Sequence, residues 1–207
     1  MLSKLTSLSL SHPASLLCCV PSASHHTTVE ICRKNDFSDL VLVHEHRGEP
    51  DGLIISHMPY GPTAYFSLSN CVLRHDIKTV DMGTVSEAFP HLVFHNMASK
   101  LGQRTASILK ALYPVPKDDA RRVMSFINRN DVISFRHHVY KKNGVQDRAA
   151  GKKEIELAEV GPRFEMRMYQ IKLGTAEMTE AETEWVLRPY HNEAAKRQLI
   201  AGYAHDK

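Results

Sequence analysis

Three side chains that suit contact with nucleic acid share one face of a predicted strand. Arg136, His138 and Tyr140 are spaced by two residues, within a stretch where apolar and polar side chains alternate. Successive side chains of a strand point to opposite faces, so these three point the same way. Arg pairs with phosphates, and His and Tyr rings stack on unpaired bases. The spacing alone fits an RNA-contacting sheet face, and it fits an ordinary solvated strand face at least as well.

Further basic residues gather in the middle of the chain. Residues 98–150 carry eleven Lys or Arg and four Asp, whereas residues 151–190 carry six basic and eight acidic side chains. A basic middle followed by an acidic stretch suits contact with a polyanion through one face, although charge alone fits a merely solvated surface equally well. The candidate RNA-binding residues are Lys100, Arg104, Arg121, Arg122, Arg136, His138, Tyr140, Lys141 and Lys142.

The common signatures of catalysis and metal binding are missing from the chain. It has no G-x-x-x-x-G-K-[ST], no G-x-G-x-x-G and no G-x-S-x-G sequence. His44 and His46 share one strand face, and His137 adjoins His138 on another strand. No further His or Cys lies at a recognised zinc spacing from them. We therefore expect no metal site, no cofactor, no small-molecule substrate and no enzymatic activity.

Length and composition limit the fold and its surroundings. A chain of 207 residues, 43% of them hydrophobic, suits one domain with tails and a buried core. No apolar run approaches the ~18 residues that span a bilayer, so we expect no membrane contact. The cysteines, Cys18, Cys19, Cys32 and Cys71, form no C-x-x-C pair, which indicates free thiols in a reducing compartment.

The hydrophobic pattern predicts mixed strands and helices from residue 29 onward. Residues 98–113 form the clearest helix, because apolar side chains recur at helical spacing and Pro114 ends the pattern. Pro59, Gly61 and Pro62 predict a rigid turn, and residues 48–52 predict a second turn. Strands are predicted over residues 39–47, 52–57, 63–68, 91–95, 123–128, 132–141, 155–160, 164–173 and 185–187, further helices over 29–34, 69–77 and 192–204, and a Gly- and Lys-rich hairpin tip over 141–153.

Several long stretches together carry a family resemblance. They are GLIISHMPYGPTAYFSLSNCVLRHDI at residues 52–77, SKLGQRTASILKALYPVP at 99–116, INRNDVISFRHHVYKK at 127–142 and LAEVGPRFEMRMYQIKLGT at 157–175. Residues 28–190 thereby resemble the Brix-domain family of ribosome-biogenesis factors, and within it the Imp class of the U-three small nucleolar ribonucleoprotein. The resemblance implies an α/β fold with helices packed on a mixed sheet. Its two similar halves are expected to be like the anticodon-binding domain of certain aminoacyl-tRNA synthetases.

The same resemblance implies a non-catalytic RNA-binding assembly factor of the nucleolus. Its expected partners in the small-subunit processome are the U-three snoRNA, pre-rRNA, an Mpp-class scaffold protein and a sister Imp-class subunit. The implied role is to help the snoRNA pair with pre-rRNA before the cleavages that release the small-subunit rRNA. The alternative is a protein-interaction module that binds a scaffold peptide without touching RNA.

The first 28 residues depart from the family pattern. They are rich in Ser, Leu and His, their one formally charged side chain is Lys4, and they fit neither a secretory nor an organellar signal. Imp-class proteins open instead with a charged helical arm, followed by a strand and a helix. We therefore expect an N-terminally truncated form, with residues 1–28 disordered, residues 29–190 forming a partial Brix domain whose first half is incomplete, and residues 191–207 forming a helical tail.

Overall fold

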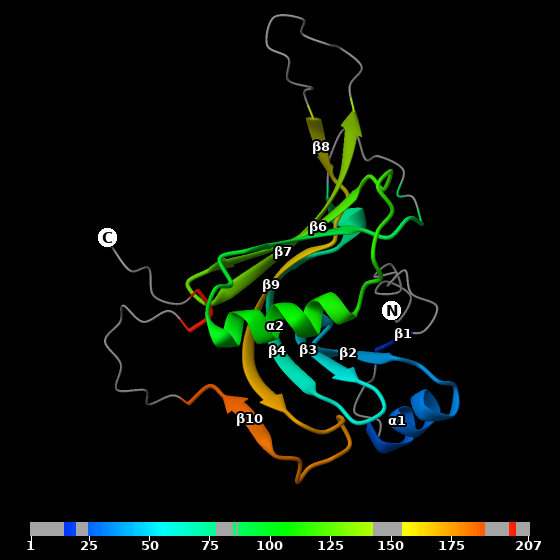
Figure 1. Cartoon of the computed structure of the whole chain (residues 1–207), viewed down its shortest axis with the longest axis vertical. Coiled ribbons are helices and arrows are strands. Elements are labelled where there is room, and N and C mark those ends of the chain that lie inside the picture. Colours follow the sequence, from blue (N-terminus) through cyan, green and yellow to red (C-terminus); the bar gives the residue numbers. More distant parts are fainter. Residues whose placement is uncertain are drawn as a thin grey trace, which may run out of the picture.

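In the part of the chain that the structure describes, ten strands form one mixed β-sheet, and two α-helices pack on it. Figure 1 shows this arrangement. The computed structural model describes residues 15–19, 25–77, 85, 87–142, 155–188 and 199–201, and only the backbone of residues 15–19, 141–142 and 155–156. The elements are β1 (Ser15–Cys19), α1 (His25–Lys34), β2 (Asp39–His46), β3 (Glu49–His57), β4 (Thr63–Val72), the 3₁₀ helix η2 (Arg74–Asp76), β5 (His91–His95), α2 (Lys100–Ala111), β6 (Arg122–Arg129), β7 (Val132–Lys142), β8 (Ile155–Glu159), β9 (Arg163–Lys172) and β10 (Thr183–Val186).

The sheet consists of two halves with the same strand pattern. Its strand order is β1-β2-β3-β4-β9-β7-β6-β5, with β8 beside β7 and β10 beside β9. In the first half β1 and β2 are parallel, and β3 and β4 follow antiparallel. In the second half β5 and β6 repeat the parallel pair, and β7 and β9 follow antiparallel. Antiparallel β4 and β9 join the halves, which confirms the predicted α/β fold with two similar halves.

Helix α2 covers one face of the sheet with its apolar side. Leu109 of α2 belongs to the main core together with Phe126, Phe135 and Met166 from β6, β7 and β9. The N-terminus is capped by Ser99, whose Oγ accepts a hydrogen bond from the backbone nitrogen of Gly102 at 2.9 Å. These contacts confirm the helix predicted over residues 98–113.

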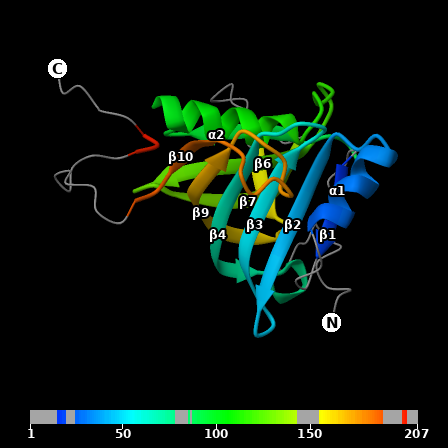
Figure 2. The ribbon, with the colours of Figure 1, turned by 90° about the horizontal axis from the view of Figure 1, so that it is seen from below.

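Helix α1 lies on the other face, at the β1–β2 end of the sheet (Figure 2). Val29 and Cys32 of α1 pack with Leu40 and Leu42 of β2, whereas Val41 between them points into the main core. Among the residues that the structure describes, no α-helix of the first half therefore lies on the face that α2 covers. An apolar hollow opens there between α2 and the first-half strands, lined by Val41, Leu53, Leu68, Val72, Leu109 and Tyr113.

Strand β1 lies within the segment that was predicted to be disordered. Ser15–Cys19 pair in parallel with residues 39–43 of β2, and α1 begins at His25, earlier than predicted. The structure thus differs from the prediction at these positions, because unpaired backbone at the edge of β2 offers hydrogen-bond partners to a neighbouring strand. The rest of residues 1–24 lies outside the described part of the chain, and the division of the chain at residue 28 stays a prediction.

Strands β3 and β4 are longer than their sequence pattern predicted. The turn expected over residues 48–52 is reduced to Arg47 and Gly48, because β3 begins at Glu49 and pairs there with His46. The helix expected over residues 69–77 is wrong except for η2, since β4 continues to Val72 and pairs with β9. The pairing of β3 with β2 and of β4 with β9 overrides the local sequence preference at these residues. The helix expected over residues 192–204 falls almost wholly outside the described residues.

We expect Gly61→Ala to destabilise the fold by about 2–3 kcal/mol, because it adds backbone strain and a steric clash. Gly61 has a φ of +101°, and a Cβ there would meet the backbone oxygen of Gly174 at 2.6 Å. Gly48→Ala is the matched control, because its φ is +87° and a Cβ there meets nothing within 4 Å. Urea unfolding of both variants measures the difference. Equal losses would contradict a packing role for Gly61.

Candidate nucleic-acid interface

The face of the sheet opposite α2 is not covered by a described helix over β5, β6, β7 and β9. We call this surface the open face (Figure 2). Alternate side chains of β6 are buried toward α2, and those between them reach solvent. Residues that pair across neighbouring strands point to the same face of the sheet; for example, Ser125 pairs with both Arg136 and Val93. The polar and basic side chains of the open face are His91, His95, Arg121, Ser125, Arg129, Ser134, Arg136, His138, Tyr140, Arg163, Glu165 and Arg167.

Arg136, His138 and Tyr140 lie on the open face together, as their spacing predicted. All three are half-buried, and their neighbours Ile133, Phe135, His137 and Val139 are buried on the other side of β7. Arg136 Nη1 donates a hydrogen bond to the backbone oxygen of Phe135 at 2.9 Å. Tyr140 Oη donates to the backbone oxygen of Ala120 at 2.8 Å. These bonds to backbone oxygens hold the cation and the ring against the sheet.

Arg121 is exposed at the start of β6, beside Tyr140. The backbone nitrogen of Tyr140 donates to the backbone oxygen of Arg121 at 3.0 Å, so the two residues are neighbours across the strands. Sequence reasoning missed further basic side chains on this face, including Arg129 and Arg167, both exposed. A period of two counted from Arg121 along residues 121–129 would have found Arg129, whereas Arg167 reaches the face only through the pairing of β9 with β7.

Acidic side chains on the open face are few among the residues that the structure describes. Glu165 accepts a hydrogen bond from Asn70 Nδ2 at 2.7 Å. Glu159 on β8 accepts one from Arg163 Nη1 at 3.2 Å. Arg121, Arg129, Arg136 and Arg167 therefore leave the face with an excess of positive charge. Guanidinium groups spread over a sheet face can contact several phosphates of one strand, a contact that carries no sequence preference.

Arg122 is buried and does not belong to the open face. Its side chain is 2% exposed, and it points toward the α2 side of β6. Arg122 Nη1 donates to the backbone oxygen of Ala88 at 3.2 Å, and Nε donates to His137 Nε2 at 3.4 Å. The sequence prediction that Arg122 contacts RNA therefore differs from the structure, which gives this residue an internal role. The neighbouring Arg121 takes the outward position because strand side chains alternate.

His137 is the buried partner of Arg122. Its Nδ1 donates to the backbone oxygen of Gly161 at 2.9 Å, so Nε2 carries the lone pair that accepts from Arg122. Burial lowers the pKa of His137 to about 4, the bond to Gly161 opposes this shift, and the cation of Arg122 adds to it. His137 is therefore neutral at physiological pH and is a structural residue.

The predicted basic residues of α2 lie on the opposite side of the sheet from the open face. Lys100 is exposed at the first position of α2. The Arg104 guanidinium pairs with the Glu184 carboxylate of β10, and its shortest bonds run from Nε to Oε1 at 2.9 Å and from Nη2 to Oε2 at 2.8 Å. Lys141 and Lys142 extend β7 beside β8, and their side chains fall outside the described part of the structure. The nine predicted residues thus do not form one surface.

The described residues hold no group of three or more His, Cys, Asp or Glu side chains placed for a metal ion. His44, one of the two histidines beside Glu45, pairs through Nδ1 with Asp51 Oδ1 at 2.5 Å. In the same part of the chain, no helix is both long and apolar enough to cross a membrane.

The chain is similar over most of its length to proteins of one name from several organisms. The chain is 54% identical over 174 residues to the U3 small nucleolar ribonucleoprotein protein IMP4 of Bos taurus, which covers 84% of this chain and 57% of that protein. It is 53% identical over the same length to the protein of that name from Homo sapiens, with the same coverage of both chains. It is 54% identical to the imp4 protein of Schizosaccharomyces pombe over 84% of this chain and 56% of the relative. The chain thus spans little more than half the length of these relatives.

A solved structure and a family model complete the comparison. The crystal structure of a probable ribosomal biogenesis protein from Aeropyrum pernix K1 aligns with 70% of this chain and 76% of its own, at a TM-score of 0.43 and 14% identity. The model of the Brix domain matches residues 14–170, a range that runs from the start of β1 into β9. On this match, the chain belongs to the Brix-domain family.

Proposed function

We propose that this chain is a non-catalytic RNA-binding assembly factor of the U-three small nucleolar ribonucleoprotein and the small-subunit processome. The observation that carries the proposal is its identity of 53–54% over 174 residues to proteins named as components of that ribonucleoprotein. Its proposed role is in the processing of pre-rRNA toward the small-subunit rRNA. The proposed location is the nucleolus, inside the nucleus.

The open face is the surface that we assign to RNA. It combines exposed Arg121, Arg129 and Arg167 with Arg136, His138 and Tyr140 on one face of the sheet. Guanidinium groups suit phosphates, while imidazole and phenol rings offer surfaces on which unpaired bases stack. Because phosphate contacts carry little sequence information, the choice of U-three snoRNA and pre-rRNA must come from partner proteins and from base pairing between the RNAs. The proposed protein partners are an Mpp-class scaffold and a sister Imp-class subunit.

We expect Arg136→Glu to weaken binding to U-three snoRNA by about tenfold or more, because a phosphate contact is lost and a negative charge is added. Lys100→Glu makes the same charge change on the α2 side and should alter the affinity less than twofold. Both substitutions leave the buried core untouched, so both should leave the thermal midpoint nearly unchanged. Filter binding across a salt series and thermal unfolding measure these quantities.

Two other experimental outcomes would contradict the proposed contact between Arg136 and RNA. A lower thermal midpoint for Arg136→Glu with intact RNA binding would make Arg136 a structural residue. Affinity that hardly falls as salt rises would argue against phosphate contact. Such a result would favour the alternative, in which the chain binds a scaffold peptide and does not touch RNA.

A further inference from the structure

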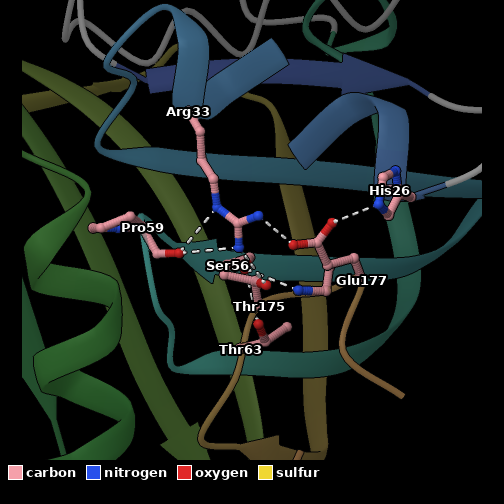
Figure 3. A network of polar contacts seen from close by, with 8 residues as sticks. His26, Arg33, Ser56, Pro59, Thr63, Thr175 and Glu177 are labelled. Carbon is pink, nitrogen blue, oxygen red and sulfur yellow. Dashed lines mark hydrogen bonds and ion pairs between the residues drawn. The ribbon is translucent and has the colours of Figure 1, made fainter. Parts of the chain in front are cut away.

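The loop between β9 and β10 is fixed at several points to the opposite half of the sheet. We call residues 173–182 the anchored loop. Arg33 of α1 forms an ion pair with Glu177, donates from Nη2 to Thr175 Oγ1 at 3.3 Å, and also donates to the backbone oxygen of Pro59 at 3.3 Å (Figure 3). His26 Nε2 lies 3.9 Å from the second carboxylate oxygen of Glu177. One arginine therefore connects the helix, the β3–β4 turn and the anchored loop.

A second set of hydrogen bonds holds the loop from beneath. Thr63 Oγ1 donates to the backbone oxygen of Gly174 at 2.6 Å, and it also contacts Ser56 Oγ at 2.8 Å. The backbone nitrogen of Ala176 donates to Ser56 Oγ at 3.3 Å. Ser56, Thr63 and Thr175 are fully buried, so these bonds are shielded from water. The anchored loop is therefore a pre-organised surface.

This rigid base presents large apolar side chains to solvent. Tyr60 is 78% exposed, Leu173 47% and Met178 42%. Tyr60 adjoins Gly61 and Leu173 adjoins Gly174, and the two glycines lie close together, because a Cβ added at Gly61 would meet the backbone oxygen of Gly174 at 2.6 Å. A Cβ added at Gly174 would lie 3.0 Å from Met178 Sδ, so Met178 also lies close to Gly174. An apolar surface held rigid and left exposed commonly marks a binding site.

Exposed acidic side chains outnumber basic ones around this surface, in contrast to the open face: Glu180 and Glu182 stand against Lys172, whose Nζ donates to the backbone oxygen of Thr179 at 3.2 Å. Glu180 and Glu182 are exposed, and within the described residues neither forms an ion pair. Glu184 is already paired with Arg104, and Glu177 with Arg33. A phosphate backbone would be repelled here, whereas Lys and Arg side chains of a polypeptide would be attracted.

We propose that Tyr60, Leu173 and Met178, rimmed by Glu180 and Glu182, form a docking site for a polypeptide segment of another protein. The segment carries apolar side chains flanked by Lys or Arg. Its apolar side chains cover the three exposed groups, and its basic side chains pair with the two carboxylates. This site lies apart from the residues that we assign to RNA, so the chain can hold a protein and an RNA at the same time.

Three fluorescein-labelled synthetic peptides of equal length test this proposal against the purified full chain. One combines Leu with Lys and Arg, the second replaces Lys and Arg by Glu, and the third replaces Leu by Ser. Fluorescence anisotropy should show the first peptide binding about tenfold tighter than either other peptide, because both kinds of contact are needed. Tyr60→Ser combined with Met178→Ser should weaken the first peptide by about tenfold or more.

Matched variants separate this surface from general stickiness and from RNA contact. Val115→Ser removes an apolar side chain that is 86% exposed outside the proposed surface, and it should leave the affinity for the first peptide unchanged. Glu180→Lys combined with Glu182→Lys should weaken that peptide without lowering the thermal midpoint. Equal binding of all three peptides, or unchanged binding by the Tyr60 and Met178 double variant, would overturn the proposal. If Tyr60→Ser combined with Met178→Ser weakened the binding of an RNA oligonucleotide as much as that of the first peptide, the surface would be assigned to RNA and the proposal would be overturned too.

Discussion

Phe135→Ala is expected to lower the free energy of unfolding by about 3–5 kcal/mol, the usual cost of removing a buried phenyl ring. Phe135 is 2% exposed and lies in the main core. Its ring centroid is 4.6 Å from that of Phe164 on β9 and 5.2 Å from that of Phe126 on β6. Alanine would remove both ring contacts and leave a cavity beneath the strand that carries Arg136. Urea unfolding of the variant measures the loss.

The control for this variant lies on the ribbon formed by β7 and β8. Leu157 is 59% exposed, so Leu157→Ala should change the free energy of unfolding by no more than about 0.5 kcal/mol. If Phe135→Ala does not fold at all, Phe135→Leu provides a milder test, with a smaller loss expected. A loss from Phe135→Ala below about 1 kcal/mol would mean that the three rings do not form the centre of the core.

Stability should fall by up to about 3 kcal/mol as pH decreases from 6.5 to 4, through His137 alone. Burial lowers the pKa of His137 from its ordinary value of 6.5 to about 4 in the folded protein. Between these values the unfolded chain binds a proton at this side chain and the folded chain does not, so acid favours unfolding. Above pH 6.5 both states are neutral there, and the effect disappears. Urea unfolding at a series of pH values measures the slope.

A substitution at His137 itself isolates this effect. His137 is buried beside Arg122. His137→Gln should reduce the dependence of stability on pH between 4 and 6.5 by up to one proton. If the variant shows the same dependence on pH as the unsubstituted protein, then His137 is not held neutral by its surroundings.

Sequence periodicity was sufficient to predict elements that have one buried side and one exposed side. The apolar spacing of residues 98–113 required a helix with one buried side, and the structure places α2 there. The alternation around residues 132–141 required a half-exposed strand, and β7 has one buried and one open side. Periodicity was insufficient at residues 69–72, because a polar stretch gives no sign of the β9 strand with which it pairs.

The candidate site likewise has one feature that the sequence predicts and one that it does not predict. That Arg136, His138 and Tyr140 share a face follows from a period of two, which is a property of any strand. That Arg122 is internal while Arg121 is outward depends on the phase of β6 against β7 and α2. Alternation along a strand says that adjacent residues differ, and it does not say which of them is buried.

The family, the α/β class and the strand face that carries Arg136 follow from the amino-acid sequence, because they depend on local pattern and on long matching stretches. Tertiary contacts are needed to know which basic residues share that face, that Arg104 pairs with Glu184, and that Arg33 holds the anchored loop. Those contacts join residues 80 and 144 positions apart in the chain. Arg33 meets Glu177 because the two halves of the sheet join at β4 and β9, and Arg104 meets Glu184 because β10 pairs with β9. No local pattern encodes a meeting of such distant segments.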